Sequence, residues 1–422
     1  MKRLRKKIHM ILLLSMIFLL IIPIPTLAQD NSFDVPAKAA IAVDFDTGKI
    51  LYEKNSTTPL PIASMSKLIS AYLVYEAIDK GQIHWNDTVS FDDELIKLTE
   101  DPELSNIPIK KNLTYTVEDN VKAMLISSSN VSTTALARLI SGSEQSFVDQ
   151  MSQKVAFWGI NDAKFISASG LDTEDLAAQD RYQGSDGKDS NILSAKDMVI
   201  VARNLLKDYP EVLEITKQPS YTLFAGTENE ETFWSSNLML PGLDYYTEGT
   251  DGLKTGTTPN AGACFIGSTV LDGHRIITVV MNVDESHSRF EVTKNLLDYV
   301  NTNWEYKTLA KAGDHAVQET MAVPNGEKET VDVILDEPIS MWVHKENSTI
   351  KEVFDANRKE LSAPVRKGQI VGTQVITDTT DTLGYLNSSD THQSSGIVVT
   401  KNENKKATIF VRVWRSLKNS IQ

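Results

Sequence analysis

A serine and a lysine three positions apart, Ser64 and Lys67, stand at the start of a strongly apolar segment. Residues at positions i and i+3 share one face of a helix, so the hydroxyl and the amine would be neighbours there. A serine hydroxyl becomes a nucleophile when a nearby base takes its proton, and a neutral lysine can be that base. The pair therefore indicates nucleophilic catalysis by Ser64, with Lys67 as its base.

The spacing alone is not specific, because the chain repeats it at 185–188 and 348–351. The first copy lies in a polar segment without periodicity and the second among short β-type runs, so nothing fixes either pair of side chains together. The segment 67–79 is apolar on nearly every side, which predicts a buried helix. Only Ser64 and Lys67 have such a rigid support, and this favours them as the reacting pair.

Two further elements could complete a site around this pair. Ser128 and Asn130 interrupt the helical sequence 117–140, which predicts two helices with a hydroxyl and a carboxamide presented from the bend between them. The tripeptide Lys-Thr-Gly at 254–256 precedes a predicted strand, where it would let a substrate backbone dock closely. Each motif alone carries little information, but all three in this order form the set found in penicillin-binding proteins and class A β-lactamases.

The rest of the sequence predicts the elements that must hold these motifs in place. Alternating apolar residues around a polar turn predict a β-hairpin over 37–55. Ser194 is a typical N-cap for a helix from about 195 to 206. Further expected elements are a surface loop at 172–191, paired strands at 263–269 and 275–282, and a helix at 290–299. Beyond about residue 310, short β-type runs predict a separate all-β module, at 331–335, 339–343, 370–376 and 396–400.

Length and composition narrow the class of protein. The chain has 422 residues, which favours about two or three domains, and 41% of them are hydrophobic, an ordinary globular balance. A net charge of −14 disfavours nucleic acid as the main partner. The single cysteine, Cys264, excludes an internal disulfide, and no histidines have the spacing of metal ligands. We therefore expect neither a metal nor another cofactor.

Basic residues gather at both ends of the chain. Within 1–28, cations precede an apolar run, two prolines and a small-residue site at Ala28, which predicts a signal peptide cleaved after that residue. A retained signal anchor is the alternative. Within 403–422, apolar residues recur every four positions opposite arginines and lysines, as in an amphipathic helix that lies in a membrane interface. A closing β-strand over 408–414 is the alternative for the first half of this tail.

Taken together, the motifs resemble those of low-molecular-weight penicillin-binding proteins, the serine-type D-alanyl-D-alanine carboxypeptidases. The resemblance covers nearly everything after the signal and rests on blocks at 61–67, 124–130, 169–172, 251–257 and 360–372. It implies an α/β (α+β) domain of the serine β-lactamase and transpeptidase type, in which helices flank an antiparallel sheet. The block at 360–372 is similar to the appended β domain of these carboxypeptidases and implies a small all-β C-terminal domain.

The resemblance also implies a catalytic role for five residues. Ser64 is the expected nucleophile, acylated by the penultimate D-alanine, and Lys67 is its general base. Ser128 relays the proton to the leaving amine. Asn130 holds Lys67 and the substrate amide, and Lys254 adds positive charge near Ser128 and the substrate carboxylate.

Substrate binding is implied for four residues near the third motif, which are Thr255, Gly256, Thr257 and Arg289. The backbone N–H groups of Ser64 and Thr257 form the implied oxyanion hole. The family has an arginine at the place of Arg289, and its planar guanidinium suits the terminal carboxylate. A solvated cation at the start of a helix is the alternative for Arg289, and ordinary strand residues are the alternative for Thr255 and Thr257.

The expected organisation of the chain has four parts: a signal peptide at 1–28, a catalytic domain at 35–308, a β-sandwich-like domain at 312–402 and a membrane-anchoring tail at 403–422. The expected activity is removal of the terminal D-alanine from peptidoglycan stem pentapeptides, with β-lactam antibiotics as covalent inhibitors. The expected location is outside the cell, either on the outer face of the cytoplasmic membrane through the tail or in the cell wall.

Two other functions remain as alternatives, a β-lactamase-like hydrolase and a non-catalytic protein that binds the wall or senses penicillin. The segment 103–106 resembles the glutamate loop that deacylates class A β-lactamases. Its spacing is short by one residue, and it precedes the Ser128 motif, whereas the lactamase loop follows the equivalent motif. We therefore interpret it as ordinary loop sequence, which argues against fast β-lactam hydrolysis. A non-catalytic binder would not need all five catalytic residues.

Overall fold

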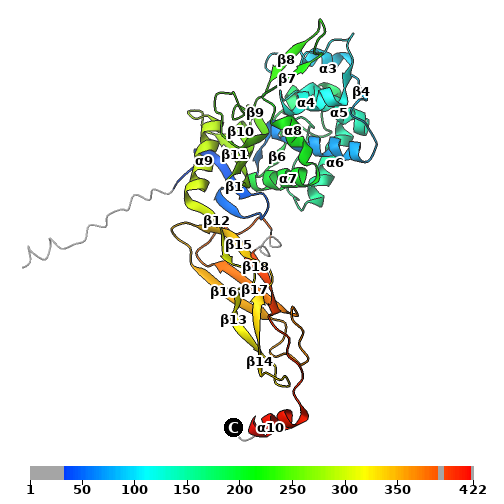
Figure 1. The fold of residues 1–422 in the computed structure, drawn as a ribbon. Helices are drawn as coiled ribbons and strands as arrows, with labels where there is room; N and C mark the ends of the chain where they lie inside the picture. The colour runs from blue at the N-terminus through cyan, green and yellow to red at the C-terminus, as the bar shows by residue number, and fades with distance from the viewer. Residues whose placement is uncertain (1–32, 388–393, 420–422) are drawn as a thin grey trace, which may run out of the picture. The chain divides into compact units, whose positions relative to one another are not determined.

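The computed structural model describes residues 33–387 and 394–419. Five antiparallel strands form its first sheet, in the order β2–β1–β11–β10–β9 (Figure 1). Their bounds are β1 Ala37–Asp44, β2 Ile50–Lys54, β9 Thr250–Thr258, β10 Gly262–Leu271 and β11 His274–Val283. The predicted hairpin at 37–55 and the predicted strand pair within 263–282 are both confirmed.

Helices cover both faces of this sheet, as expected. Helix α9 (Arg289–Asn303) packs against β1, β10 and β11, and helix α7 (Ala195–Asp208) packs against β1 and β11 on the opposite side (Figure 1). The short helix α8 (Leu213–Thr216) contacts β9. Because both faces are covered, β1 is buried at nearly every position and shows no alternation of buried and exposed residues.

A group of helices surrounds the segment that carries the first motif. Helix α2 (Lys67–Asp79) is almost entirely buried and has the predicted bounds. It contacts helices α4 (Val117–Leu125), α5 (Asn130–Ser141), α6 (Glu144–Phe157) and α7, and α3 (Asp93–Leu98) packs on α5. The predicted break in the helical sequence 117–140 is confirmed, because α4 ends before Ser128 and α5 begins at Asn130.

Local sequence sets the start of two of these helices. The Thr116 side chain accepts a hydrogen bond from the Asp119 N–H, and the Asp119 carboxylate accepts one from the Thr116 N–H at the start of α4. Ser194 and Asp197 form the same reciprocal capping box at the start of α7. The predicted N-cap at Ser194 is therefore confirmed.

Three short strand pairs tie the loops of this region together. They are β3 (Leu60–Pro61) with β6 (Ile192–Leu193), β4 (Thr88–Val89) with β5 (Tyr115–Thr116), and β7 (Ser220–Leu223) with β8 (Glu231–Trp234). The first pair fixes the chain immediately before the Ser64 motif.

The segment 172–191 is only partly the surface loop that its polar sequence predicts. Several of its polar side chains are buried, because they have partners inside the protein. The Asp180 carboxylate accepts a hydrogen bond of 3.0 Å from Arg138 Nε, and Asn191 Oδ1 accepts one of 2.7 Å from the Ile166 N–H. Polarity alone could not distinguish these anchored residues from exposed ones.

A second region is built entirely from strands and has its own hydrophobic core. Its five-stranded antiparallel sheet has the order β13–β14–β18–β17–β16, and β12 pairs separately with β15. The bounds are β12 Trp304–Ala310, β13 His315–Ala322, β14 Thr330–Leu335, β15 Ile339–His344, β16 Ile350–Ala356, β17 Ile370–Asp378 and β18 Ser395–Thr400. The predicted all-β module is thus confirmed. The expected boundary at 308–312 overlaps the last residues of β12, which begins at Trp304 and pairs with β15 of this module.

Three strands of this region were not predicted, namely β12, β13 and β16. Strand β13 buries only Ala316 and Met321, and β16 has no fully buried residue. Strands with so little apolar surface do not produce the alternating pattern from which strands are recognised. The four predicted runs, in contrast, correspond to β14, β15, β17 and β18, which contribute most of the core.

The C-terminal tail forms helix α10 (Ile409–Asn419), so the alternative of a closing strand over 408–414 is wrong. The four-residue spacing of Ile409 and Val413 matches a helical period and not the two-residue period of a strand. The predicted signal peptide at 1–28 lies outside the described residues.

Candidate active site

The serine of the first motif lies on a turn of 3-10 helix, Ala63–Ser66, that leads directly into α2. Lys67 is the first residue of α2, and its Nζ lies 2.8 Å from Ser64 Oγ. Ala63 has a positive φ of 47°, which is uncommon for a residue with a Cβ atom. The tight turn presents the Ser64 hydroxyl to the pocket while the rest of α2 stays in the core. The contact expected from the i, i+3 spacing is therefore present, although on a 3-10 turn.

The Lys67 amine is completely buried and contacts three oxygen atoms. Besides Ser64 Oγ, it donates to Asn130 Oδ1 and to the Ser169 carbonyl, both at 2.7 Å. Burial and, to a smaller extent, the charge of Lys254 lower the pKa of Lys67 well below its ordinary value. In the neutral amine, two hydrogens satisfy Asn130 and Ser169, which leaves the lone pair for the Ser64 hydroxyl. This geometry suits a base that takes the proton of Ser64.

A second serine–lysine pair faces the same pocket. Ser128 lies in the bend between α4 and α5 with a positive φ of 64°, and Lys254 Nζ donates to its hydroxyl at 3.0 Å. Lys254 is buried on β9 and also donates to the Thr255 carbonyl at 3.1 Å. Burial, with a smaller contribution from Arg289, lowers the pKa of Lys254 to about 7. A lysine whose pKa lies near neutral pH becomes protonated readily when an anion binds beside it.

Strand β9 supplies one wall of the site. The Thr255 hydroxyl donates to Ser236 Oγ at 2.8 Å. Gly256 packs so closely on the turn before Ser64 that a Cβ atom would lie 2.7 Å from the Ile62 carbonyl oxygen. A side chain at this position would push β9 away from the nucleophile, so the glycine is required for the close approach.

Arg289 begins α9 and is held against β9 and β10. Its Nη1 donates to the carbonyls of Gly256 at 2.6 Å and Cys264 at 2.9 Å, and its Nη2 donates to Thr257 Oγ1 at 2.8 Å. Arg289 is half-buried, so it is not the solvated cation of the alternative interpretation. Its guanidinium and the Thr257 hydroxyl together form a donor surface for a carboxylate.

A cavity of about 210 Å³ lies among these groups, and Lys67, Asn130 and Lys254 are not among the residues that line it. The sequence identified five of its lining residues: Ser64, Ser128, Thr255, Thr257 and Arg289. It missed three others, Ser105, Ser236 and Phe290. None of these three belongs to a motif with its own spacing signal, because each reaches the cavity through the tertiary fold.

The loop that contains Ser105 and Asn106 supports the start of α5 through contacts that the sequence did not reveal. The Ser105 carbonyl accepts a hydrogen bond from the Asn130 N–H, and Asn106 Oδ1 accepts one from the Val131 N–H, both at 2.9 Å. The segment 103–106 is therefore a loop, as interpreted, and it fixes the start of α5. Glu103 within it is exposed and does not line the cavity.

The loop at 167–172 supports the Lys67 amine. Gly170 has a φ of 85°, and a Cβ atom there would lie only 1.9 Å from the Ala63 carbonyl oxygen. The fully buried Glu144 accepts a 2.7 Å hydrogen bond from the Ala168 N–H, next to the Ser169 carbonyl that contacts Lys67. Burial raises the pKa of Glu144 to about 7. The resemblance included this block, but the contacts that explain it come only from the fold.

Comparison with known proteins agrees with this geometry. Residues 26–285 match the family model of D-alanyl-D-alanine carboxypeptidases, the peptidase S11 family. Residues 304–389 match the model of the penicillin-binding protein 5 C-terminal domain. The D-alanyl-D-alanine carboxypeptidase DacF of Bacillus subtilis is 31% identical over 343 residues, which are 81% of each chain.

Solved structures resemble the chain over different shares of its length. A penicillin-binding protein 3 from Streptococcus pneumoniae, described as a peptidoglycan synthesis regulatory factor, is 41% identical with a TM-score of 0.72, covering 88% of this chain and all of that one. Penicillin-binding protein D2 from Listeria monocytogenes, solved with cefotaxime bound, is 32% identical with a TM-score of 0.53, covering 64% of this chain and 98% of that one. The chain thus belongs to the D-alanyl-D-alanine carboxypeptidase family and is a low-molecular-weight penicillin-binding protein of the serine peptidase class.

Proposed function

We propose that this carboxypeptidase releases the terminal D-alanine of peptidoglycan stem pentapeptides through an acyl-enzyme on Ser64. The observation that carries the assignment is the contact of the buried Lys67 amine with Ser64 Oγ and Asn130 Oδ1. A second pair, Lys254 and Ser128, reaches the same cavity through Ser128 and can move the second proton. The catalytic roles of these five residues are the proposal, and their mutual contacts support it.

Acylation would proceed in two steps. Lys67 Nζ takes the Ser64 proton as Oγ attacks the carbonyl carbon of the penultimate D-alanine, and the resulting oxyanion lies at the backbone N–H groups of Ser64 and Thr257. The C–N bond then breaks. The leaving amine receives a proton through the Ser128 hydroxyl, which Lys254 orients, and free D-alanine departs.

Deacylation requires water to attack the ester on Ser64, with Lys67 again as the base. No carboxylate lines this cavity in the described part of the chain, whereas class A β-lactamases deacylate with the help of a glutamate. β-Lactams would therefore acylate Ser64 and remain bound. This favours the carboxypeptidase over the β-lactamase-like alternative, and the complete set of mutual contacts disfavours a non-catalytic binder.

Arg289→Ala tests whether the site recognises the C-terminal carboxylate of the substrate. A carboxypeptidase must recognise the terminal carboxylate. We therefore expect a lower kcat/KM for the pentapeptide, equivalent to a loss of about 2–4 kcal/mol of transition-state stabilisation. A pentapeptide with an amidated C-terminus should be a poor substrate of the wild type and nearly indifferent to the substitution. The measurement is a double-mutant-style cycle: kcat/KM is determined for the wild type and for Arg289→Ala, each with the free and with the amidated pentapeptide.

The cycle separates carboxylate binding from a structural effect of the same arginine. Arg289 also holds the carbonyls of Gly256 and Cys264, so its loss could disturb β9 and lower activity on both substrates alike. Equal losses on the free and the amidated peptide would show that Arg289 does not contact the carboxylate.

We further propose that export and a peripheral membrane contact place the enzyme on the outer face of the cytoplasmic membrane. The signal peptide that the sequence predicts at 1–28 supports export. Exposed apolar side chains of α10 support the membrane contact, at Ile409, Phe410, Val413 and Trp414. Within the described residues, no helix has both the length and the apolar character needed to cross a bilayer. A helix of 11 residues is about 16 Å long, which suits an interfacial position.

Deletion of residues 409–422 should release the signal-cleaved protein from anionic vesicles without lowering its activity on a soluble pentapeptide. The deletion begins at Ile409, because Asn404 and Ala407 are hydrogen-bonded to the β module. High salt should weaken wild-type binding, since basic residues near an anionic surface contribute about 1 kcal/mol each. Vesicle co-sedimentation measures both effects, and unchanged sedimentation of the deleted protein would disprove the membrane contact.

A further inference from the structure

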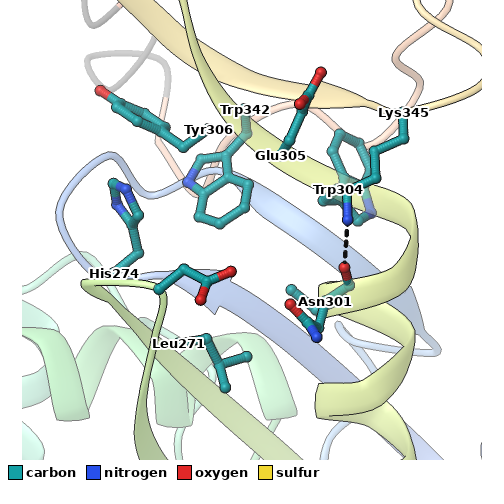
Figure 2. Close-up of a pocket in the computed structure, with 10 residues that line it drawn as sticks. Leu271, His274, Asn301, Trp304, Glu305, Tyr306, Trp342 and Lys345 are labelled. Atoms are coloured by element: carbon teal, nitrogen blue, oxygen red, sulfur yellow. Dashed lines mark hydrogen bonds between the residues drawn. The ribbon is translucent and has the colours of Figure 1, made fainter.

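A second cavity lies at the end of the first sheet that faces β12 and β15, and it has no part in the chemistry described above. The turn between β10 and β11, the C-terminal end of α9 and the strands β12 and β15 enclose a volume of about 310 Å³. Figure 2 shows Tyr306, Trp342 and Trp304 on one side of this cavity and Leu271 and Asn301 on the other. The volume lies in the range of small-ligand sites.

Aromatic rings form most of one wall. The His274 ring lies 4.4 Å from the Tyr306 ring and 5.2 Å from the Trp342 ring, measured between centroids, and the Tyr306 and Trp342 rings are 5.7 Å apart. The Trp304 ring completes the wall, and Lys49 Nζ lies 4.8 Å from its centroid. Mutual packing holds these rings, so the wall is formed before any ligand arrives.

Hydrogen-bonding groups surround the rings. Asp272 and Glu305 contribute carboxylates, and Asn301 contributes a carboxamide. Lys345 Nζ donates to the Asn301 backbone carbonyl at 2.6 Å, which fixes one edge of the cavity (Figure 2). Two carboxylates and a lysine that is already hydrogen-bonded disfavour an anionic ligand and suit one that presents hydroxyl groups.

Two donors in the aromatic wall have no acceptor. The indole N–H groups of Trp304 and Trp342 are buried and find no hydrogen-bond partner among the described residues. An unsatisfied buried donor costs about 1–3 kcal/mol, and such groups in a native protein call for an explanation. Both groups belong to residues that line the cavity, so an oxygen atom of a bound ligand is a candidate acceptor.

We propose that this cavity binds a pyranose unit of the peptidoglycan glycan strand. A pyranose has apolar C–H faces that pack on aromatic rings and hydroxyl or amide groups around its edge that bond to carboxylates and carboxamides. A cavity of this volume holds one sugar ring better than an extended peptide. The inference rests on the peptidoglycan substrate proposed above and adds a second contact with the same polymer.

The position of the cavity fits a polymeric substrate. Arg289, in the active site, is the first residue of α9, and Asn301, in the second cavity, lies near its other end. Twelve residues of helix, a rise of about 18 Å, separate Arg289 from Asn301. A stem peptide bound at Ser64 and a sugar bound at the second cavity would therefore belong to the same strand or to neighbouring strands.

Binding is tested with tri-N-acetylchitotriose as the probe and ¹⁵N-tryptophan-labelled, signal-cleaved protein. The chain has six tryptophans, and Trp304→Phe and Trp342→Phe assign two of the six indole N–H signals. We expect the sugar to shift these two signals and to leave the signal of Trp234, an exposed residue of β8, unchanged. Tyr306→Ala should weaken the sugar affinity at least tenfold, and Tyr306 is exposed enough for the variant to fold.

Activity provides the second readout. Tyr306→Ala and Asp272→Asn should each raise KM for D-alanine release from polymeric peptidoglycan about fivefold or more, with kcat/KM for the soluble pentapeptide unchanged. Phe157→Ala is the matched control, because Phe157 is an exposed aromatic residue of α6 that lines neither cavity, and it should change neither value.

Three results would overturn the sugar proposal. The first is that the sugar shifts neither the Trp304 nor the Trp342 indole signal. The second is that only a sugar-free pentapeptide shifts these signals. The third is that the variants lose activity equally on polymeric peptidoglycan and on the soluble pentapeptide. A wild-type protein that binds the sugar but does not hydrolyse the pentapeptide would instead contradict the proposed function and leave the second site supported.

Discussion

Ser64→Ala is expected to abolish both covalent labelling by β-lactams and D-alanine release. The Ser64 hydroxyl is the only one in contact with the Lys67 amine among the described residues, so its removal leaves no nucleophile for acylation. The loss should reach roughly 10⁴-fold or more, the scale measured when a catalytic nucleophile is removed. Labelling with a fluorescent penicillin and assay of released D-alanine measure the two activities.

Ser66→Ala is the matched control for this variant. Ser66 is two residues further along the chain and completely buried, with its hydroxyl donating to the Ala63 carbonyl at 2.7 Å and accepting from Asn191 Nδ2 at 2.9 Å. Its loss should reduce stability by about 1–3 kcal/mol but leave labelling intact in the folded protein. Labelling that survives Ser64→Ala and disappears in Ser66→Ala would refute the assignment.

Lys67→Met is expected to slow acylation by roughly 10²–10⁴-fold, the usual contribution of a general base. The pKa of Lys67 lies well below its ordinary value, and the neutral amine is the active form. Acylation by the wild type should therefore increase as the pH rises through this lowered pKa, and Lys67→Met should lose that increase. Stopped-flow measurement of β-lactam acylation against pH records both effects.

Lys49→Met controls for the loss of any buried lysine. Lys49 is also completely buried, but its Nζ donates to the Ile50 and Gly384 carbonyls and to Asp381, away from the Ser64 cavity. This variant should lose stability and keep both the rate and the pH dependence of acylation. A Lys67→Met enzyme with the wild-type pH profile would show that another group is the base.

The contact of Ser64 with Lys67 could be predicted from sequence because it is local. Ser64 and Lys67 are three residues apart, and the apolar segment behind them indicates the helix that supports Lys67. Ser128 and Asn130 were found for the same reason, since they interrupt a helical pattern. The contact of Ser128 with Lys254 follows from the order of the motifs and the family resemblance, because no local pattern joins residues so far apart.

The supporting contacts could not be predicted, because they depend on how distant loops pack. The Ser169 carbonyl holds Lys67 through its backbone, which leaves no trace in residue type. Ser236 and Ser105 are ordinary serines in irregular segments, and only the fold brings them to the cavity. The polarity of the segment 172–191 predicts a surface loop, although internal partners bury part of it.

The same limit applies to the fold. Strands that bury a regular apolar face were recognised, and β13 and β16, which expose most of their side chains, were missed. The four-residue spacing of the tail favoured a helix over a strand, and α10 is a helix. Periodic burial leaves a signal in the sequence, whereas exposed strands stabilised mainly by backbone hydrogen bonds do not.

Intact-protein mass spectrometry during turnover of a stem pentapeptide tests the central claim most directly. The signal-cleaved protein is mixed with substrate, quenched in acid within the first turnovers and digested to locate the modification. We expect an adduct equal in mass to the acyl group of the pentapeptide without its terminal D-alanine, on the peptide that contains Ser64, together with an equivalent of free D-alanine. A β-lactam should modify the same residue. Release of D-alanine without an adduct, or an adduct on any other residue, would contradict the proposed mechanism.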